Sequence, residues 1–370
     1  MTTVVVIGFE PFNEEMYPHT YEVLKIIESQ CRLIYLDGDD RGFSLYKRSL
    51  SRPDLVSRLK SVRELLAIAR KTALLRSKIK CALALPPDFV IAIDHSALHY
   101  AAKYLNAKTG LIFWSQDIFT QDHPWHVSPG IKKLITGNRN DIRKARRIIV
   151  QDGNRAAVLD SVLMCHEIPK LYLPVSLRAD DFSRNEAQNR RSHSLDKGLS
   201  LLQLGSINPN RSSDLVLDAF QKTDPPVRLV FKGIIDPSII SLADTYPRKP
   251  EVLPLSKSFI DMRRAISRAD VGIIACKQKN LNNYFFSRAS GQLVEFVRLG
   301  IPVIIIDMKE LGEFVERYGC GIAVPNAADI PRALKKITDD YATFAGSCAV
   351  VYDDVFDLRL YEQAVLESIA

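Results

Sequence analysis

The sequence predicts an α/β protein of two domains, each built on a parallel sheet with crossover helices. Short, uninterrupted apolar runs recur along the chain, as in buried parallel strands, and amphipathic stretches of helical length separate them. The alternation stops once, in a polar stretch at residues 181–198, and then restarts. A chain of 370 residues is also longer than a single small core requires, so two domains are expected.

In the first domain, residues 1–180, polar or turn-forming residues bound each apolar run, which is typical of a buried strand. The expected strands are Val4–Gly8, Arg32–Leu36, Asp88–Ile93, Leu111–Trp114 and Ile148–Gln151. The expected helices are Tyr21–Ser29, the basic stretch Asp54–Lys80 and Ser96–Leu105. Because strands and helices alternate, the connections are crossovers and the sheet is parallel.

The stretch 181–198 is polar, charged and poor in apolar residues, so it is expected to be a linker. The second domain, residues 199–354, repeats the alternation. Its expected strands are Ser200–Leu204, Arg228–Phe231, Val271–Ala275 and Val303–Ile306, and its expected helices are Asp214–Phe220, Asp261–Ala269 and one from Ser290-Gly291 to Gly300. A last helix is expected at 355–369.

The segment 269–324 carries the most specific chemistry in the chain. Glu295 is the one acidic residue in the second turn of an otherwise apolar helix, where a carboxylate without a partner is costly to bury. The same helix opens with Ser290 as a cap and Gly291, which permits close backbone approach. Helix-start amides bind phosphate and a carboxylate binds hydroxyls, so the pattern suits a ligand that carries both.

The runs SGQLVEFVRLGIPVI (290–304) and ELGEFVERYGCGIAV (310–324) resemble the donor-nucleotide motif of GT-B glycosyltransferases, most of all glycosyltransferase family 4. The family pattern is E-A/Y-x-A-x-G-x-P-V, then G-x-x-E-x-V-x-x-G-x-x-G. The resemblance implies the GT-B fold, with two Rossmann-like domains facing a central cleft and the last helix packed back on the first domain. It also implies that Glu295 binds the ribose hydroxyls, and that pyrophosphate meets the amides of Gly291, Gln292 and Leu293.

The chain departs from the family pattern around the donor. Many members carry another Glu eight positions before Glu295, where this chain has Ser287. The usual Arg after the first strand of the second domain is Ser206 here. A pyrophosphate still needs cations, and two basic residues lie near the positions that bind phosphate in the family: Arg211 and Lys232. The alternative for each residue is that it is an ordinary surface charge in contact with solvent.

Further candidates lie in loops. The resemblance places the loop 277–286 against the donor sugar, and Asn283 and Tyr284 are its candidates, since amides both donate to and accept from hydroxyls. In the first domain, His95 and Asp117 follow the ends of two strands, where open α/β sheets bind ligands. Both are catalytic candidates, although the family often has His-Asp where this chain has Gln116-Asp117. The alternatives are that Asp94 caps a helix and that Asp117 only shapes a loop.

The net charge is +7, and basic residues cluster at 58–80 and 132–147. They are either two solvated helix faces or surfaces that bind anionic lipid, as a lipid-linked acceptor would require. No aromatic-interleaved basic motif indicates nucleic acid. The six cysteines show no metal-binding spacing, and no signal peptide or membrane-spanning run is present. A cytoplasmic protein is therefore expected, with peripheral contact at the inner face of the plasma membrane if the basic clusters meet lipid.

The resemblance implies a retaining glycosyltransferase that needs no metal or other cofactor. Its donor would be a nucleoside diphosphate sugar, with a UDP-sugar favoured and UDP-glucose one candidate, and its acceptor a glycan or lipid-linked glycan in polysaccharide biosynthesis. Neither G-x-G-x-x-G after the first strand nor a P-loop or G-x-S-x-G motif is present, which argues against an oxidoreductase, a P-loop enzyme and an α/β hydrolase. A UDP-sugar 2-epimerase of the same architecture and a non-catalytic nucleotide-sugar-binding partner stay open.

Overall fold

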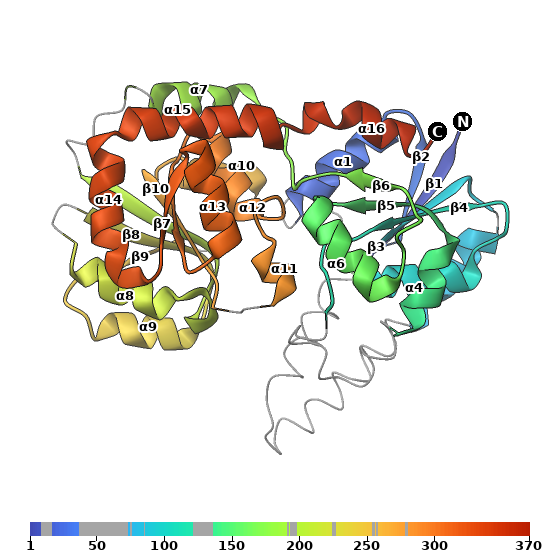
Figure 1. The fold of residues 1–370 in the computed structure, drawn as a ribbon, viewed down its shortest axis with the longest axis horizontal. Coiled ribbons are helices and arrows are strands. Elements are labelled where there is room, and N and C mark those ends of the chain that lie inside the picture. Colours follow the sequence, from blue (N-terminus) through green and yellow to red (C-terminus); the bar gives the residue numbers. More distant parts are fainter. Residues whose placement is uncertain are drawn as a thin grey trace, which may run out of the picture. The chain divides into compact units, whose positions relative to one another are not determined.

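A computed structural model describes residues 1–8, 17–36, 73–74, 76–84, 86–120, 136–190, 192, 198–223, 227–253, 256, 258–277 and 280–370. The chain divides into two compact units (Figure 1). Unit 1 comprises Met1–Leu173 together with Tyr361–Ala370, and unit 2 comprises Pro174–Leu360. No helix in these ranges is long and apolar enough to cross a membrane.

Unit 1 contains a six-stranded sheet in which every pairing is parallel, in the order β2-β1-β3-β4-β5-β6. The strands are β1 (Thr3–Ile7), β2 (Arg32–Leu36), β3 (Phe89–Ile93), β4 (Gly110–Trp114), β5 (Ala145–Val150) and β6 (Lys170–Tyr172). The chain adds β2 on one side of β1 and then β3 on the other. This reversal creates a topological switch point at the carboxyl ends of β1 and β3, where such sheets bind ligands.

The helices of unit 1 include α1 (Pro18–Glu28), α4 (Asp94–Tyr104), α6 (Gly153–Leu163) and α16 (Glu362–Glu367), and residues 76–84 and 136–141 are also helical. The short helix α16 packs against α1. The single helix expected at 355–369 is broken in the structure, because a π-helical turn at Tyr352–Phe356 and a 3₁₀ turn at Leu358–Leu360 precede α16. Of the basic stretch 54–80, residues 73–74 and 76–80 are helical and the others lie outside the described ranges.

Unit 2 contains a second six-stranded parallel sheet, in the order β12-β11-β10-β7-β8-β9. Its strands are β7 (Leu199–Ile207), β8 (Val227–Ile235), β9 (Glu251–Leu253), β10 (Val271–Ala275), β11 (Val303–Ile306) and β12 (Gly321–Val324). The switch point lies between β7 and β10. The predicted fold class, an α/β protein with two parallel sheets, is confirmed.

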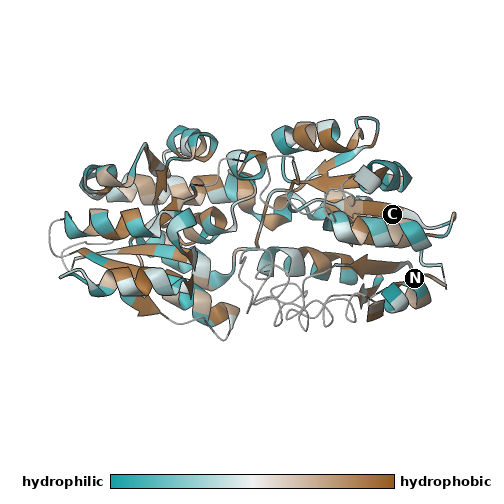
Figure 2. Ribbon diagram, turned by 90° about the horizontal axis from the view of Figure 1, so that it is seen from below, coloured by the Kyte–Doolittle hydropathy of each residue, from teal (hydrophilic) through white to brown (hydrophobic). Residues whose placement is uncertain are grey.

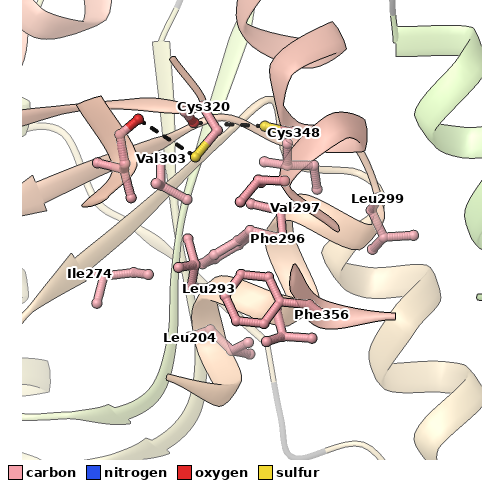
Figure 3. Close-up of a cluster of buried hydrophobic side chains, with 14 of the residues drawn as sticks. Leu204, Ile274, Leu293, Phe296, Val297, Leu299, Val303, Cys320, Cys348 and Phe356 are labelled. Atoms are coloured by element: carbon pink, nitrogen blue, oxygen red, sulfur yellow. Dashed lines mark hydrogen bonds between the residues drawn. The ribbon is translucent and has the colours of Figure 1, made fainter. Parts of the chain in front are cut away.

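Helices cover both faces of the second sheet (Figure 1). They are α7 (Asp181–Arg190), α8 (Ser213–Gln221), α9 (Pro237–Asp244), α10 (Phe259–Ile266), α11 (Leu281–Tyr284), α12 (Gly291–Arg298), α13 (Lys309–Tyr318), α14 (Ile330–Asp339) and α15 (Tyr341–Val351). One buried cluster joins the sheet to α10, α12, α13 and α15, and Figure 3 shows Leu293, Phe296 and Val297 of α12 inside it. The other cluster joins the sheet to α8, α9 and α14. Figure 2 shows apolar strands in both units, surrounded by helices of mixed polarity.

The stretch expected to be a linker, 181–198, begins with a helix that belongs to unit 2, so the prediction of a linker is wrong for 181–190. The helix α7 has no apolar stripe, because its buried residues are Ser183, Ala187 and Arg190. Small side chains let α7 lie close to its neighbours, and the backbone of Gly300 packs directly against Ala187. Because its sequence is polar, this packed helix was not predicted.

Arg190 joins α7 to the sheet through a buried polar cluster. Its guanidinium Nη1 donates to Asp270 Oδ1 at 3.2 Å and to Tyr341 Oη at 3.1 Å, and its Nη2 donates to the Ser267 carbonyl. Asp270 Oδ2 accepts from the amide of Ser200 at 2.8 Å, and Tyr341 Oη donates to the Asp270 carbonyl at 3.0 Å. Burial raises the pKa of Tyr341 to about 12, so the phenol stays protonated and keeps that bond at neutral pH.

Candidate functional site

The strongest candidate site lies where α12 begins, beside the carboxyl end of β7. Ser290 caps the helix, because its hydroxyl accepts from the amide of Leu293 at 3.2 Å. Gln292 Nε2 donates to the carbonyl of Leu204, near the end of β7. The helix start is therefore fixed at the switch point of the second sheet, which is the general ligand position in open α/β sheets.

Two glycines let the ends of β7 and β8 approach closely there. Gly205 and Gly233 are partners in the parallel register, with φ values of 93° and 140°. A Cβ on Gly233 would lie 1.9 Å from the Gly205 carbonyl oxygen, and a Cβ on Gly205 would lie 2.9 Å from Gln292 Nε2. Only glycine fits these conformations without strain, so backbone borders the site on this side.

Glu295, one turn into α12, is only 3% exposed. Its Oε2 accepts from Arg298 Nη2 at 2.7 Å, while its Oε1 has no hydrogen-bond partner in the described part of the protein. Arg298 is anchored in turn, since its Nη1 donates to the Arg178 carbonyl at 3.4 Å and its guanidinium lies 5.4 Å from the Phe259 ring centroid. The carboxylate is thus held in one orientation, with its second oxygen buried and unpaired among the described residues.

The three amides expected to meet a pyrophosphate are not equivalent. The amide of Leu293 is engaged by the Ser290 cap. Gly291 and Gln292 are the first two residues of the helix, where backbone amides have no intrahelical acceptor. A phosphate role therefore rests on Gly291 and Gln292, which lie one turn before Glu295.

One candidate cation lies on a strand that approaches this site, and the other lies in the turn that follows the neighbouring strand. Lys232 of β8 pairs in register with Leu204 and is buried beside Gly233, and burial lowers the pKa of its ammonium while Asp261 opposes that shift. Arg211 lies in the 3₁₀ turn Pro209–Arg211 after β7. Its backbone is held by its carbonyl, which accepts from Gln203 Nε2 at 2.8 Å.

We expect Arg211→Ala and Lys232→Met each to weaken UDP binding about tenfold, because a charge-assisted bond to phosphate contributes roughly 1.5 kcal/mol. Binding of uridine, which lacks phosphate, should not change. Titration calorimetry with both ligands measures the difference. Arg228→Ala on the same strand, whose side chain is 67% exposed, is the control. Equal losses for uridine and UDP would remove these residues from the phosphate position.

The candidates for the donor sugar lie on the one-turn helix α11. Asn280 caps this turn, and its Oδ1 accepts from the amide of Asn283 at 2.9 Å. Tyr284 is 45% exposed, and its ring meets Phe285 edge-on at 5.0 Å between centroids. Asn283 and Tyr284 are thus displayed by a short, capped turn between β10 and α12.

In unit 1, Asp94 connects the ends of β3 and β4. Its Oδ1 accepts from the amides of Gln116 at 2.8 Å and Asp117 at 3.2 Å. Its φ of 63° places it in the left-handed region, which is uncommon for a residue with a side chain. Asp94 is the first residue of α4, and its carboxylate serves the neighbouring loop rather than capping its own helix.

The two catalytic candidates have different surroundings. His95 is buried, with its ring edge-on to Phe113 and Phe119 at 5.7 and 5.0 Å between centroids. Its Nδ1 lies 3.0 Å from Asn138 Nδ2. Asp117, in the loop after β4, is partly exposed. Of the two, Asp117 has the access to solvent that contact with a substrate requires.

A buried arginine, which the sequence did not single out, holds the same loop. Arg155 of α6 donates from Nη2 to the Gln116 carbonyl at 2.8 Å and from Nε to Gln151 Oε1 at 2.7 Å. Gln151 Nε2 donates to the Ser115 carbonyl at 2.9 Å. No motif reveals this role, because it depends on which strand ends become neighbours in the sheet.

The basic clusters are only partly described. Residues 58–72 and 132–135, with five and two of the basic side chains, lie outside the described ranges. Among the others, Lys144 Nζ donates to the Ala102 carbonyl at 2.6 Å, Arg139 Nε to the Val162 carbonyl at 2.9 Å, and Arg76 Nη2 to Tyr100 Oη. These three basic residues have structural partners.

No family model and no curated protein matches the sequence. Solved structures do match it along its length. Anabaena HepE in complex with UDP-glucose has a TM-score of 0.69 at 13% identity, covering 99% of both chains. WaaG, a glycosyltransferase involved in lipopolysaccharide biosynthesis, has a TM-score of 0.63 at 14% identity, covering 99% of this chain and 98% of WaaG.

Sucrose-phosphate synthase from Thermosynechococcus elongatus has a TM-score of 0.65 at 12% identity, again covering 99% of this chain and 98% of the enzyme. At such identities the likeness establishes architecture and leaves activity to be argued from the site. Two parallel six-stranded sheets and full-length superposition agree with the resemblance in the sequence: the chain has the GT-B glycosyltransferase fold.

Proposed function

We propose that the protein is a glycosyltransferase that uses a nucleoside diphosphate sugar. The observation that carries the proposal is Glu295, which is fixed by Arg298 through one oxygen and has no hydrogen-bond partner at the other among the described residues. A ribose diol would donate to that carboxylate. The diphosphate would accept from the amides of Gly291 and Gln292, one turn earlier, at the positive end of the helix dipole.

A UDP-sugar is the proposed donor, with UDP-glucose the first to test. Structures of Anabaena HepE contain UDP and UDP-glucose, and a similar trehalose-phosphate synthase is named UDP-forming. The proposed acceptor is a glycan or lipid-linked glycan, since WaaG and the galactosyltransferase WaaB are named for lipopolysaccharide. Asp117 is the proposed acceptor-side residue, and contact of the basic clusters with anionic membrane remains part of the proposal.

Catalysis would come from stabilising the leaving diphosphate. As the bond between the sugar and the diphosphate breaks, negative charge grows on the phosphate oxygens. Helix amides and the side chains of Arg211 and Lys232 would offset that charge without reorganising, which is how preorganised sites lower barriers. The resemblance to family 4 favours retention of configuration, and product analysis by NMR would decide it.

We expect Glu295→Ala to weaken UDP binding roughly 10- to 150-fold, because charge-assisted bonds to two ribose hydroxyls contribute about 1.5–3 kcal/mol. Titration calorimetry measures the loss. Glu313→Ala, in an exposed ion pair on α13, is the matched control and should bind UDP normally.

Arg298 would lose its partner in that variant, so a double variant is needed. In Glu295→Gln/Arg298→Met, both side chains keep their approximate volume and no buried charge is left alone. UDP affinity should remain low. If the double variant binds UDP as the wild type does, the loss came from the orphaned arginine, and Glu295 does not contact the ribose.

A non-catalytic nucleotide-sugar-binding protein is the second candidate, favoured by Ser287 and Ser206 at two positions where the family pattern has charged residues. A thermal-shift screen with UDP, GDP, ADP and their sugars would identify the ligand of either protein, because binding to the folded state alone raises its stability. Slow hydrolysis of the bound UDP-sugar would then distinguish them, since only an enzyme should cleave it.

A further inference from the structure

A carboxylate from α13 holds the chain just before α12. Glu310 lies in the first turn of α13, and Ser287, which is 1% exposed, lies four residues before the first residue of α12. Glu310 Oε2 accepts from the amides of Phe286 at 3.0 Å and Ser287 at 2.9 Å. Glu310 Oε1 accepts from the Ser287 hydroxyl.

These bonds place a carboxylate at a position where the sequence has none. The pattern that the chain resembles often has Glu at 287, and this chain has Ser. A serine side chain is short and donates a hydrogen bond, so it leaves room for Glu310 and binds it. The acidic group at this place is thus supplied by a helix 23 residues further along the chain.

The order of groups along the backbone matches the order of groups in a sugar nucleotide. Glu295 is proposed to take the ribose, and the amides of Gly291 and Gln292 the diphosphate. Ser287 with Glu310 comes next in the same direction. The group beyond the diphosphate in the donor is the sugar that is transferred.

Among the described residues, the hydrogen bonds to Glu310 leave it one acceptor position. A carboxylate offers about four acceptor positions, and donors of Phe286 and Ser287 occupy three of them. These three bonds fix its orientation before any ligand arrives. A preorganised acceptor binds a hydroxyl without first losing side-chain entropy.

We propose that Glu310 is a specificity-determining residue that accepts a hydrogen bond from a hydroxyl of the donor sugar. The proposal rests on the proposed function, because it needs the nucleotide at the start of α12. The competing explanation is that Glu310 is only a clamp for the loop, and such a clamp would serve UDP and UDP-sugars equally.

The test compares the affinities of UDP and of UDP-glucose, UDP-galactose and UDP-N-acetylglucosamine in calorimetry. Glu310→Ser should bind UDP within twofold of the wild type and should bind the preferred UDP-sugar about tenfold more weakly. Ser287→Glu/Glu310→Ser returns a carboxylate to the same place from the other residue. It should recover most of the lost affinity, which a loop clamp gives no reason to expect.

Glu310→Gln is a second test that can be used if Glu310→Ser disturbs folding. The amide oxygen still accepts from the backbone, while the charge is lost, so the loop stays held and UDP-sugar affinity should still fall. Glu313→Gln on the same helix is the control. An equal loss of UDP and UDP-sugar in Glu310→Ser, or no loss in Glu310→Gln, overturns the proposal. A wild type that binds neither ligand overturns the proposed function itself, along with this role.

Discussion

Replacing Gly233 by alanine should destabilise unit 2 by more than about 4 kcal/mol, a loss that single substitutions seldom reach. The added Cβ would lie 1.9 Å from the Gly205 carbonyl oxygen, and that oxygen belongs to the backbone of the neighbouring strand. The φ of 140° is also unfavourable for any residue with a side chain. Either β8 must leave its register or the ends of β7 and β8 must separate.

The same substitution elsewhere provides the control. Gly346 lies inside α15, and nothing is within 4 Å of its added Cβ. Gly346→Ala should therefore keep or raise the melting temperature, because alanine favours a helix by roughly 0.5–1 kcal/mol. Hydrogen exchange should show lost protection in β7 and β8 of Gly233→Ala only. A Gly233→Ala protein as stable as the wild type would mean that the two strand ends do not approach as described.

Arg190→Met should cost about 3–5 kcal/mol, the usual result of leaving one buried charge without its partner. Asp270 would remain buried beside the Ser200 amide, and α7 would lose its bonds to Tyr341 and to the Ser267 carbonyl. Thermal unfolding followed by circular dichroism would measure the loss, with chemical denaturation monitored separately for each unit, because two units need not unfold together.

Two further variants isolate the cause. Arg228→Met removes an exposed arginine whose Nη1 lies 3.9 Å from Glu251 Oε2, and such surface pairs contribute about 0–1 kcal/mol. Arg190→Met/Asp270→Asn removes the orphaned charge and should be more stable than Arg190→Met alone. If Arg190→Met and Arg228→Met unfold at the same temperature, the buried cluster does not anchor α7.

The sequence predicted the strands well where they are central and apolar. Val271–Ala275 and Val303–Ile306 were predicted with the bounds that the structure has, because buried parallel strands are continuous apolar runs. The edge strands β6, β9 and β12 were not predicted; β6 and β9 have only three residues each and include exposed or charged ones. The helix α7 was missed for a different reason: its buried residues, Ser183, Ala187 and Arg190, form no apolar pattern.

The residues of the site that lie close together in the sequence could be predicted. Glu295, Ser290 and Gly291 belong to one helix, so the order of residues already set their spacing. The pairing of Glu295 with Arg298 could also have been predicted, because Arg298 lies three residues further along the same helix. Glu310 was not, because its contact with Ser287 spans two elements that only the packed sheet brings together. For the same reason, the sequence could not predict the contact between Arg155 and the loop after β4.

The last ten residues belong to unit 1, although all of unit 2 separates them from β6. A ribosome therefore completes the whole of unit 2 before it makes α16. Until then, the nascent first unit lacks the helix that packs on α1, whose buried side chain is Val365. Of the two units, the first to be started is thus the last to be completed.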